Sequence, residues 1–316
     1  MKHDTIAIRK VDAFTTRPFS GNTAGVVTHG GERLTASQMQ AIAREMNVAE
    51  TAFLLPPSRA EADLRIRWFT PAKEVSLCGH ATVASFHSAA EEGSWGLEHD
   101  GVTRIRMECL SGILPIEVTK RGDDPAIVRM GLPDPPMEEW PDPSRALAAL
   151  GLAPDHRAAD LAAVRCGFFS LVPVKSLAAL RAIRPSMQAV SEVTTSMGGD
   201  GLIVASLETI DSGSAVHVRM FAPAAGVDED PVTGSAEGPI AGWLARIGYF
   251  ARGDARFRRL ADGRFAYTAE QGDIIGRRGR IDVELSVINE GFVSRGHGIS
   301  ILGRAVTVME GTIRVP

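Results

Sequence analysis

The sequence contains few cysteines and no long apolar run. Its three cysteines, Cys78, Cys109 and Cys166, lie far apart and form no CxxC pair, which argues against a disulfide framework and for a reducing compartment. No apolar segment approaches the roughly 18 residues needed to cross a bilayer. The first residues, MKHDTIAIRKVDAF, lack the apolar core of a signal peptide. We therefore expect a cytoplasmic protein that makes no membrane contact.

An excess of basic charge is also absent. The formal net charge is −4 at pH 7 and the pI is about 6.1, so we expect no nucleic-acid partner. The lack of a strand-associated GxGxxG and of GxxxxGK[ST] disfavours a nicotinamide dehydrogenase and a P-loop enzyme. Cys78 and His80 have no CxxC or HxxxH companion, so we expect no metal site.

The chain is long enough for two domains. Its 316 residues, 44% hydrophobic and 23% charged, suit a globular enzyme of two units with about 150 residues each. Alternating strand and helix patterns indicate an α/β or α+β fold. Thr35 and Gln38 form a capping box that opens one helix. We expect strands at residues 6–14, 24–28, 51–55, 63–69, 169–174, 201–206 and 216–221, and further helices at 82–92, at 177–184 and from about 236.

Two segments of the chain repeat. The peptide RWFTP, residues 67–71, resembles RMFAP, residues 219–223. Cys78 follows the first proline by seven residues, as Asp230 follows the second, and a small-residue helix entrance comes after each. We therefore expect a duplicated unit in which Cys78 and Asp230 are equivalent. The join should lie near the turn-rich stretch 133–143 or just before it.

The two helix entrances are candidate anion sites. Free N–H groups and the positive end of the helix dipole attract a carboxylate or a phosphate. Gly79 and Gly234 would let the backbone approach a ligand closely, and Ser235 adds a hydroxyl donor. Gly-His and Gly-Ser can also serve as plain helix caps, but their symmetric placement favours a ligand site between two facing halves.

Titratable residues lie in or near these entrances. His80 stands where the helix dipole favours its neutral form, and His87, further along the helix, should pack or lie at the surface. Asp230 ends the acidic run 228–230, whose first two residues we expect at a solvated face, and could orient a histidine or a substrate amine. Glu50 is either an exposed turn residue or a partly buried carboxylate whose pKa rises toward neutrality, so that it takes and returns a proton.

Six segments together resemble the phenazine-biosynthesis PhzF-like isomerase family. They are VDAF, GNTAGVV, MQAIAREMNVAETAFL, RIRWFTPAKEVSLCGHATVAS, VRMFAPAAGVDEDPVTGSAEG and EQGDIIGRRGRIDVEL, in family order over nearly the whole chain. The resemblance implies a diaminopimelate-epimerase-like α+β fold of two pseudo-symmetric domains, each a sheet around a central helix. The halves would comprise residues 1–125 with the returning strand 304–316, and residues 126–303, with the active site between them. The resemblance also implies a homodimer that needs no cofactor.

The resemblance also assigns roles to individual residues. It places the catalytic glutamate, histidine and aspartate at Glu50, His80 and Asp230, and the substrate-binding groups at Gly79, Gly234 and Ser235. It implies an isomerase that moves a proton within a small unsaturated or amino carboxylic acid. Two alternatives stay open: a racemase or epimerase of an amino or imino acid that uses Cys78, and a non-catalytic carboxylate-binding protein. The expected match of Cys78 with Asp230 disfavours a two-thiol racemase.

Overall fold

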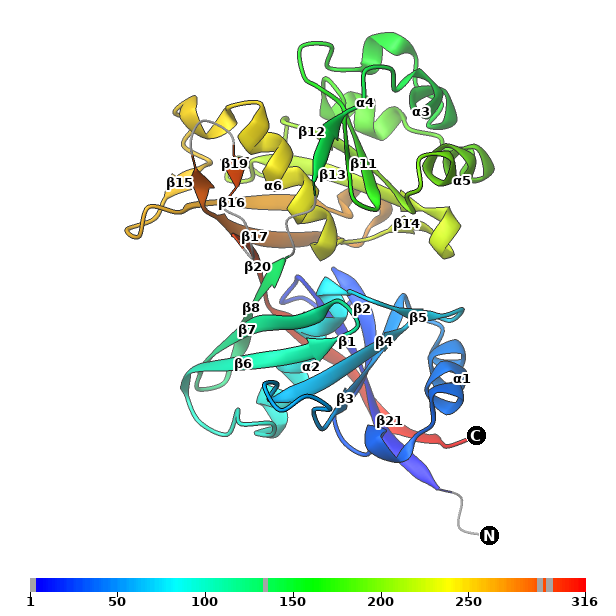
Figure 1. Ribbon diagram of the computed structural model, residues 1–316, viewed down its shortest axis with the longest axis vertical. Coiled ribbons are helices and arrows are strands. Elements are labelled where there is room, and N and C mark those ends of the chain that lie inside the picture. The colour runs from blue at the N-terminus through cyan, green and yellow to red at the C-terminus, as the bar shows by residue number, and fades with distance from the viewer. Residues whose placement is uncertain (1–3, 133–135, 289–291, 294–297) are drawn as a thin grey trace. The chain divides into compact units, whose positions relative to one another are not determined.

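The computed structural model describes residues 4–132, 136–288, 292–293 and 298–316, and the chain divides into two compact units (Figure 1). The first unit comprises Met1–Gly131 and Leu302–Pro316, and the second comprises Leu132–Ile301. The boundary expected after residue 125 thus falls after Gly131. Each unit is α+β, as expected. None of the described helices is both long and apolar enough to cross a bilayer.

The strands and helices follow the order of the sequence pattern. The strands of the first unit are β1 (Thr5–Ala13), β2 (Asn22–Val27), β3 (Glu50–Leu55), β4 (Leu64–Phe69), β5 (Glu74–Val75), β6 (Gly101–Cys109), β7 (Gly112–Arg121), β8 (Asp124–Leu132) and β21 (Ala305–Arg314). Its helices are α1 (Ala36–Met46) and α2 (Gly79–Glu92).

The second unit contains the remaining elements. Its strands are β9 (Met137–Glu139), β10 (Val164–Cys166), β11 (Phe169–Pro173), β12 (Gly201–Ser206), β13 (Val216–Ala222), β14 (Val227–Asp230), β15 (Arg258–Arg259), β16 (Phe265–Gln271), β17 (Gly279–Leu285), β18 (Val287–Ile288) and β19 (Phe292–Val293). Its helices are α3 (Ser144–Ala149), α4 (Leu177–Ala182), α5 (Met187–Ser196) and α6 (Glu237–Arg246). Strand β20 (Ile299–Gly303) begins in the second unit and ends in the first.

Strand pairing shows that the two units repeat one topology. In the first unit the order is β21-β1-β2-β3-β4-β6-β7, with parallel pairs β2–β3 and β4–β6 and antiparallel pairs elsewhere. In the second unit the order is β9-β10-β11-β12-β13-β16-β17, with parallel pairs β11–β12 and β13–β16 at the same places. The last strand, β21, pairs with β1 along its whole length, so the end of the chain returns to the first unit.

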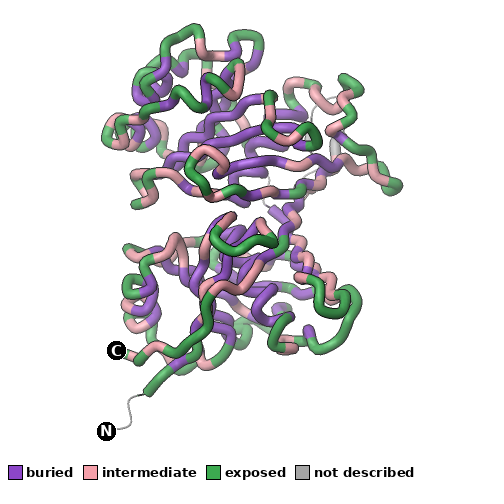
Figure 2. Tube along the Cα trace, turned by 180° about the vertical axis from the view of Figure 1, so that it is seen from behind, coloured by how far each residue is buried: buried purple, intermediate pink, exposed green. Residues whose placement is uncertain are grey.

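A buried helix runs through each unit. Every residue of α2 from Gly79 to Ala90 is buried, and all but Gly242 and Arg246 of α6 are buried. Both helices have buried residues on every face, which is the pattern of a helix enclosed by other elements. In Figure 2 the buried residues gather inside each unit, while the connecting loops are exposed.

Further helices cover the outer faces of the sheets. Met39, Ile42 and Ala43 of α1 pack with residues of β1, β2 and β3, and the capping box of Thr35 and Gln38 is formed as expected. In the second unit α3, α4 and α5 pack over β11, β12 and β13. Each unit therefore has an inner helix and an outer helical layer.

A bidentate ion pair recurs at the same place in both units. Nε and Nη2 of Arg67 donate to Glu74 at 2.7 and 2.6 Å, and those of Arg219 donate to Glu229 at 2.8 and 2.7 Å. Each guanidinium also lies 5.0 Å from the ring centroid of the phenylalanine two positions on. The prediction that Glu229 lies at a solvated face is wrong, because its side chain is 15% exposed and paired with Arg219.

These ion pairs show which residues of the two units correspond in sequence. Glu74 follows Phe69 by five positions and Glu229 follows Phe221 by eight, so the second loop is three residues longer. Val75 of β5 lies opposite Trp68, and Asp230 of β14 lies opposite the matching Met220.

Counted from the paired glutamates, the helix entrances align as Cys78-Gly79-His80 with Thr233-Gly234-Ser235. In the same register, the left-handed glycine after α2, Gly93 with φ 60°, matches Gly248 with φ 66° after α6. The predicted equivalence of Cys78 and Asp230 is therefore wrong: Thr233 matches Cys78.

Candidate active site

The candidate site of the first unit lies where β3 and α2 begin. Glu50 is the first residue of β3 and lies opposite Ala24 of β2. Cys78 occupies the N-cap position of α2, and His80 is the second residue of the helix. The side chain of Glu50 is 15% exposed and that of His80 is 5% exposed. Glu50 is therefore a partly buried carboxylate and not an exposed turn residue.

The start of α2 differs from the expected one for a local reason. The pattern predicted a helix from residue 82, but it begins at Gly79. The hydroxyl of Thr82 donates to the carbonyl oxygen of Cys78 at 2.6 Å, and the backbone N–H of Thr82 bonds to the same oxygen. The buried hydroxyl of Thr82 is thereby satisfied by the helix backbone, and His80 lies within the first turn.

The three side chains form one cluster. Oε2 of Glu50 lies 3.1 Å from Nε2 of His80, although the two groups are not aligned as a hydrogen bond. Sγ of Cys78 lies 3.5 Å from Nδ1 of the same ring. Among the described residues, Oε2 of Glu50 and Nε2 of His80 have no hydrogen-bond partner. Apart from their contact with each other, the two buried atoms are therefore not committed to another described residue.

Asn22 contacts the imidazole of His80 on the side away from Glu50. Its Nδ2 lies 3.2 Å from Nδ1 of His80, and the residue is 1% exposed. With the amide in this orientation, Nδ2 donates to Nδ1, and the proton of a neutral ring is on Nε2, toward Glu50. Rotation of the amide by 180° would present its oxygen to a doubly protonated ring. The contact can therefore accompany either charge state of His80.

Burial and the neighbouring groups raise the pKa values of Cys78 and His80. Burial, with the nearby charge of Glu50, raises the pKa of the Cys78 thiol to about 11. Burial by itself lowers the pKa of His80, but its contacts with Cys78 and with the Glu50 carboxylate outweigh it and raise that pKa well above its usual range. At neutral pH the cluster therefore contains a protonated thiol and a histidine that readily holds a proton.

A strained loop places Asn22. Gly21 has φ 63°, and a Cβ there would lie 2.1 Å from the carbonyl oxygen of Ala13, so only glycine fits. The buried carboxylate of Asp12 accepts from the backbone N–H of Phe19 at 2.7 Å and from the hydroxyl of Thr23 at 2.5 Å. Our sequence interpretation assigned no function to Asn22 or Asp12. Asn22 lies in the segment GNTAGVV, which was used only as evidence for the family resemblance.

The corresponding entrance of the second unit contains different groups. Thr233 donates its hydroxyl to Asp230 at 2.5 Å, and its backbone N–H donates to Gln271 at 3.1 Å. Nε2 of Gln271 donates to the carbonyl oxygen of Asp230 at 2.7 Å. Asp230 and Gly234 are buried and Ser235 is partly buried. The predicted site residues thus form two groups, Glu50, Cys78, Gly79 and His80 in one unit, and Asp230, Gly234 and Ser235 in the other.

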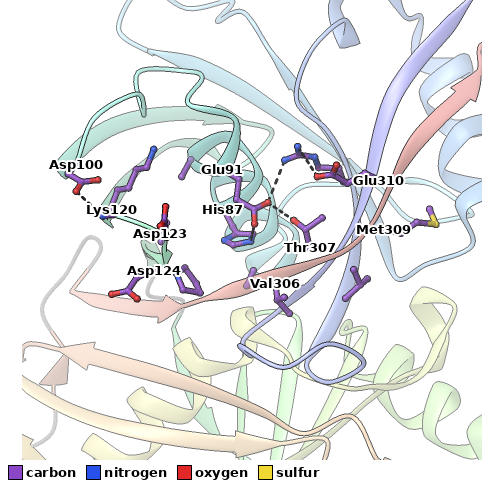
Figure 3. Close-up of a pocket in the computed structure, with 17 residues that line it drawn as sticks. His87, Glu91, Asp100, Lys120, Asp123, Asp124, Val306, Thr307, Met309 and Glu310 are labelled. Carbon is purple, nitrogen blue, oxygen red and sulfur yellow. Dashed lines mark hydrogen bonds and ion pairs between the residues drawn. The ribbon is translucent and has the colours of Figure 1, made fainter.

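A separate cavity lies along the second half of α2. Its volume is about 860 Å³, and His87, Glu91, Lys120 and Thr307 are among its lining residues (Figure 3). His87 is buried, which agrees with packing rather than a surface position, and its Nε2 lies 3.1 Å from Oε1 of Glu91. None of the predicted site residues lines this cavity, so size alone does not locate the candidate site.

Known proteins resemble the chain over nearly its whole length. Residues 11–311 match the family described as phenazine biosynthesis-like protein. An uncharacterized isomerase of Clostridium acetobutylicum is 33% identical over 312 residues, which cover 96% of each chain. The crystal structure of a PhzF-family phenazine biosynthesis protein from Bacillus anthracis superposes with a TM-score of 0.81 at 30% identity, covering 98% of this chain and 99% of that one.

The fold extends beyond this family. The structure of a probable proline racemase from Agrobacterium radiobacter has a TM-score of 0.61 at 15% identity, over 98% of this chain and 93% of that one. This confirms the expected epimerase-like fold. The match over residues 11–311 and the relatives named isomerases show that the chain belongs to the phenazine biosynthesis-like family and is an isomerase-type enzyme.

Proposed function

We propose that the protein moves a proton within a small unsaturated or amino carboxylic acid, and that Glu50 takes and returns this proton. The contact of 3.1 Å between Oε2 of Glu50 and Nε2 of His80 carries the proposal. Both atoms are buried without a hydrogen-bond partner among the described residues. A carboxylate held in this way can accept a proton from carbon without first losing strong hydrogen bonds.

His80 would keep Glu50 ready for each step. Its raised pKa favours a ring that carries a proton on Nε2 and faces the carboxylate. Such a ring stabilises the carboxylate while Glu50 acts as the base. Asn22 is then a positioning residue, because its amide holds the opposite side of the ring.

The properties of Cys78 favour Glu50 over the thiol as the base. A pKa of about 11 leaves Cys78 protonated at neutral pH, and the thiolate is the reactive form of cysteine. Thr233 occupies the matching position in the second unit, so no second thiol completes a pair. The racemase that uses Cys78 is therefore the weaker alternative.

The helix entrances would bind the substrate. In this proposal, backbone N–H groups at Gly79 and Gly234 hold the substrate carboxylate and stabilise the negative charge that develops on it. Ser235 donates a further hydrogen bond, and Asp230 contacts a polar substituent. Substrate binding would exclude water, so that the proton on Glu50 returns to the same molecule.

The proposal is tested with a panel of small unsaturated and amino carboxylic acids in D₂O, followed by proton NMR. We expect the wild-type protein to isomerise, or exchange a carbon-bound proton of, at least one acid. Glu50→Gln should lower this rate by about 10² or more, because it keeps the shape and removes the base. Glu45→Gln, at an exposed position of α1, is the matched control. Equal rates for Glu50→Gln and Glu45→Gln would refute the role of Glu50.

A further inference from the structure

We propose that Glu50, Cys78 and His80 form a binding site for a thiophilic divalent cation, with Zn²⁺ as the best match, and that the bound ion inhibits the enzyme. The binding follows from the geometry of the cluster. The inhibition rests on the function proposed above, in which Glu50 must be free to accept a proton.

The spacing of two ligand atoms already suits zinc. Zn–S and Zn–N bonds of about 2.3 and 2.0 Å at a tetrahedral angle put the two ligand atoms about 3.5 Å apart. Sγ of Cys78 and Nδ1 of His80 are separated by 3.5 Å. An ion can therefore bridge these two side chains without a change in their separation.

Glu50 supplies the third ligand. One ligand atom from each of Glu50, Cys78 and His80 lies within 4.8 Å of the other two, and this is a group of three metal-binding side chains among the described residues. Oε2 of Glu50 lies 3.1 Å from Nε2 of His80, so the carboxylate would turn from this nitrogen toward an ion held by Sγ and Nδ1. Sequence spacing predicted no metal because the third ligand comes from a different element, far upstream of the Cys-His pair.

The ligand set selects the type of ion. Thiolate and imidazole favour Zn²⁺ over Mg²⁺ and Ca²⁺, which prefer oxygen ligands. One thiolate, one carboxylate and one neutral imidazole around Zn²⁺ have no net charge, which lowers the cost of burial. On binding, the Cys78 S–H bond breaks, an S–Zn bond forms and the proton leaves to solvent. A protonated His80 releases a second proton, and Asn22 loses its hydrogen bond to Nδ1.

Bound Zn²⁺ would stop proton transfer in a simple way. The ion occupies a lone pair of Glu50 and one nitrogen of His80, so the carboxylate no longer accepts a proton from the substrate. The same three side chains would therefore be active when free and inactive when metal-bound.

The binding is tested on the full chain by competition for Zn²⁺ with a chromophoric chelator, without substrate. Cys78→Ser should weaken binding by at least about 100-fold, because it removes a ligand, and Glu50→Gln should weaken it by less. Cys109→Ser, which changes another buried free cysteine of the same unit, should bind as the wild type does. Equal affinity of Cys78→Ser and the wild type would overturn the site.

Two further measurements separate the steps. Co²⁺ added to the wild-type protein should give the near-ultraviolet charge-transfer band of a thiolate ligand, and its absence would overturn the site whether or not a variant folds. Calorimetry in two buffers of different ionisation enthalpy should show proton release with Zn²⁺. If Zn²⁺ binds and turnover is unaffected, the inhibition is wrong; failure to find a turned-over acid leaves the binding result intact.

Discussion

Glu108 in the first unit and Glu270 in the second occupy matching places on β6 and β16, opposite Arg65 and His217. Glu108 accepts backbone N–H groups from the loop between β3 and β4. Glu270 accepts them in the same way from the loop between β12 and β13. In each unit, a glutamate carboxylate therefore holds the matching loop by accepting its backbone N–H groups. This feature recurs in addition to the arginine–glutamate pair.

The units differ where the central helix begins. The first has Cys78 and His80 at positions where the second has Thr233 and Ser235. In the register set by β3–β4 and β12–β13, Glu50 corresponds to Gly201. The scaffold is duplicated and its titratable groups are not. In the function proposed above, the first unit supplies the groups that transfer the proton.

The largest expected difference between the units is in the pH dependence of stability. It arises at the fourth residue after Cys78 in the first unit and after Thr233 in the second. Thr82 of α2 corresponds to Glu237 of α6, which is buried and accepts a hydrogen bond from the Tyr267 hydroxyl at 3.0 Å. Burial raises the pKa of Glu237 from 4.5 to about 8. A raised acid pKa means that the folded chain holds the proton more tightly, so this stabilisation is complete below pH 4.5 and is lost as the pH rises through about 8.

We therefore expect the second unit to lose roughly 4 kcal/mol of stability over that pH range. Hydrogen exchange of α6 peptides should accelerate with pH beyond its intrinsic dependence, while that of α2 peptides should not. Glu237→Gln should remove the difference. The same acceleration in Glu237→Gln as in the wild type would show that another group is responsible.

The recurring ion pair should contribute unequally to the two units. The side chains of Arg219 and Glu229 are 7% and 15% exposed, against 17% and 23% for Arg67 and Glu74. Arg219→Met leaves a more deeply buried carboxylate unpaired and should cost about 3 kcal/mol, whereas Arg67→Met should cost about 2 kcal/mol. Urea unfolding of both variants measures this order, and the reverse order would contradict the burial argument.

The second unit has Ser235 at the position that corresponds to His80. Asn22 therefore has no counterpart there that contacts a helix-entrance histidine. Asn22→Ala should lower turnover by about 10-fold, because His80 loses the amide that contacts Nδ1 and positions its ring. It should also shift the pH profile of turnover, which a loss of stability alone would not do. An unchanged profile with lowered turnover would limit Asn22 to a structural role.

Local signals in the sequence were sufficient for much of this fold. The capping box of Thr35 and Gln38 and the helix-ending Gly93 depend on neighbours along the chain, and both are present. The repeat was visible because its arginine forms the recurring ion pair and its phenylalanine packs against the guanidinium. The match of Cys78 with Asp230 failed because equal spacing from a proline does not reveal three extra residues in a loop.

The site was less predictable because its contacts are long-range. Asn22 reaches His80 across 58 positions of sequence, and no periodicity reports such a contact. Glu50 was ambiguous from its neighbours, since its burial depends on β2 and α2. The third ligand of the proposed metal site was hidden for the same reason.

The central claim is that the first unit transfers the proton through Glu50 and not through Cys78. The most direct test compares the turnover of Glu50→Gln and Cys78→Ser with an acid that the wild-type protein converts. We predict a fall of about 10² or more for Glu50→Gln and a fall of less than about 10-fold for Cys78→Ser. Loss of turnover in Cys78→Ser together with an active Glu50→Gln would contradict the account and identify the thiol as the base.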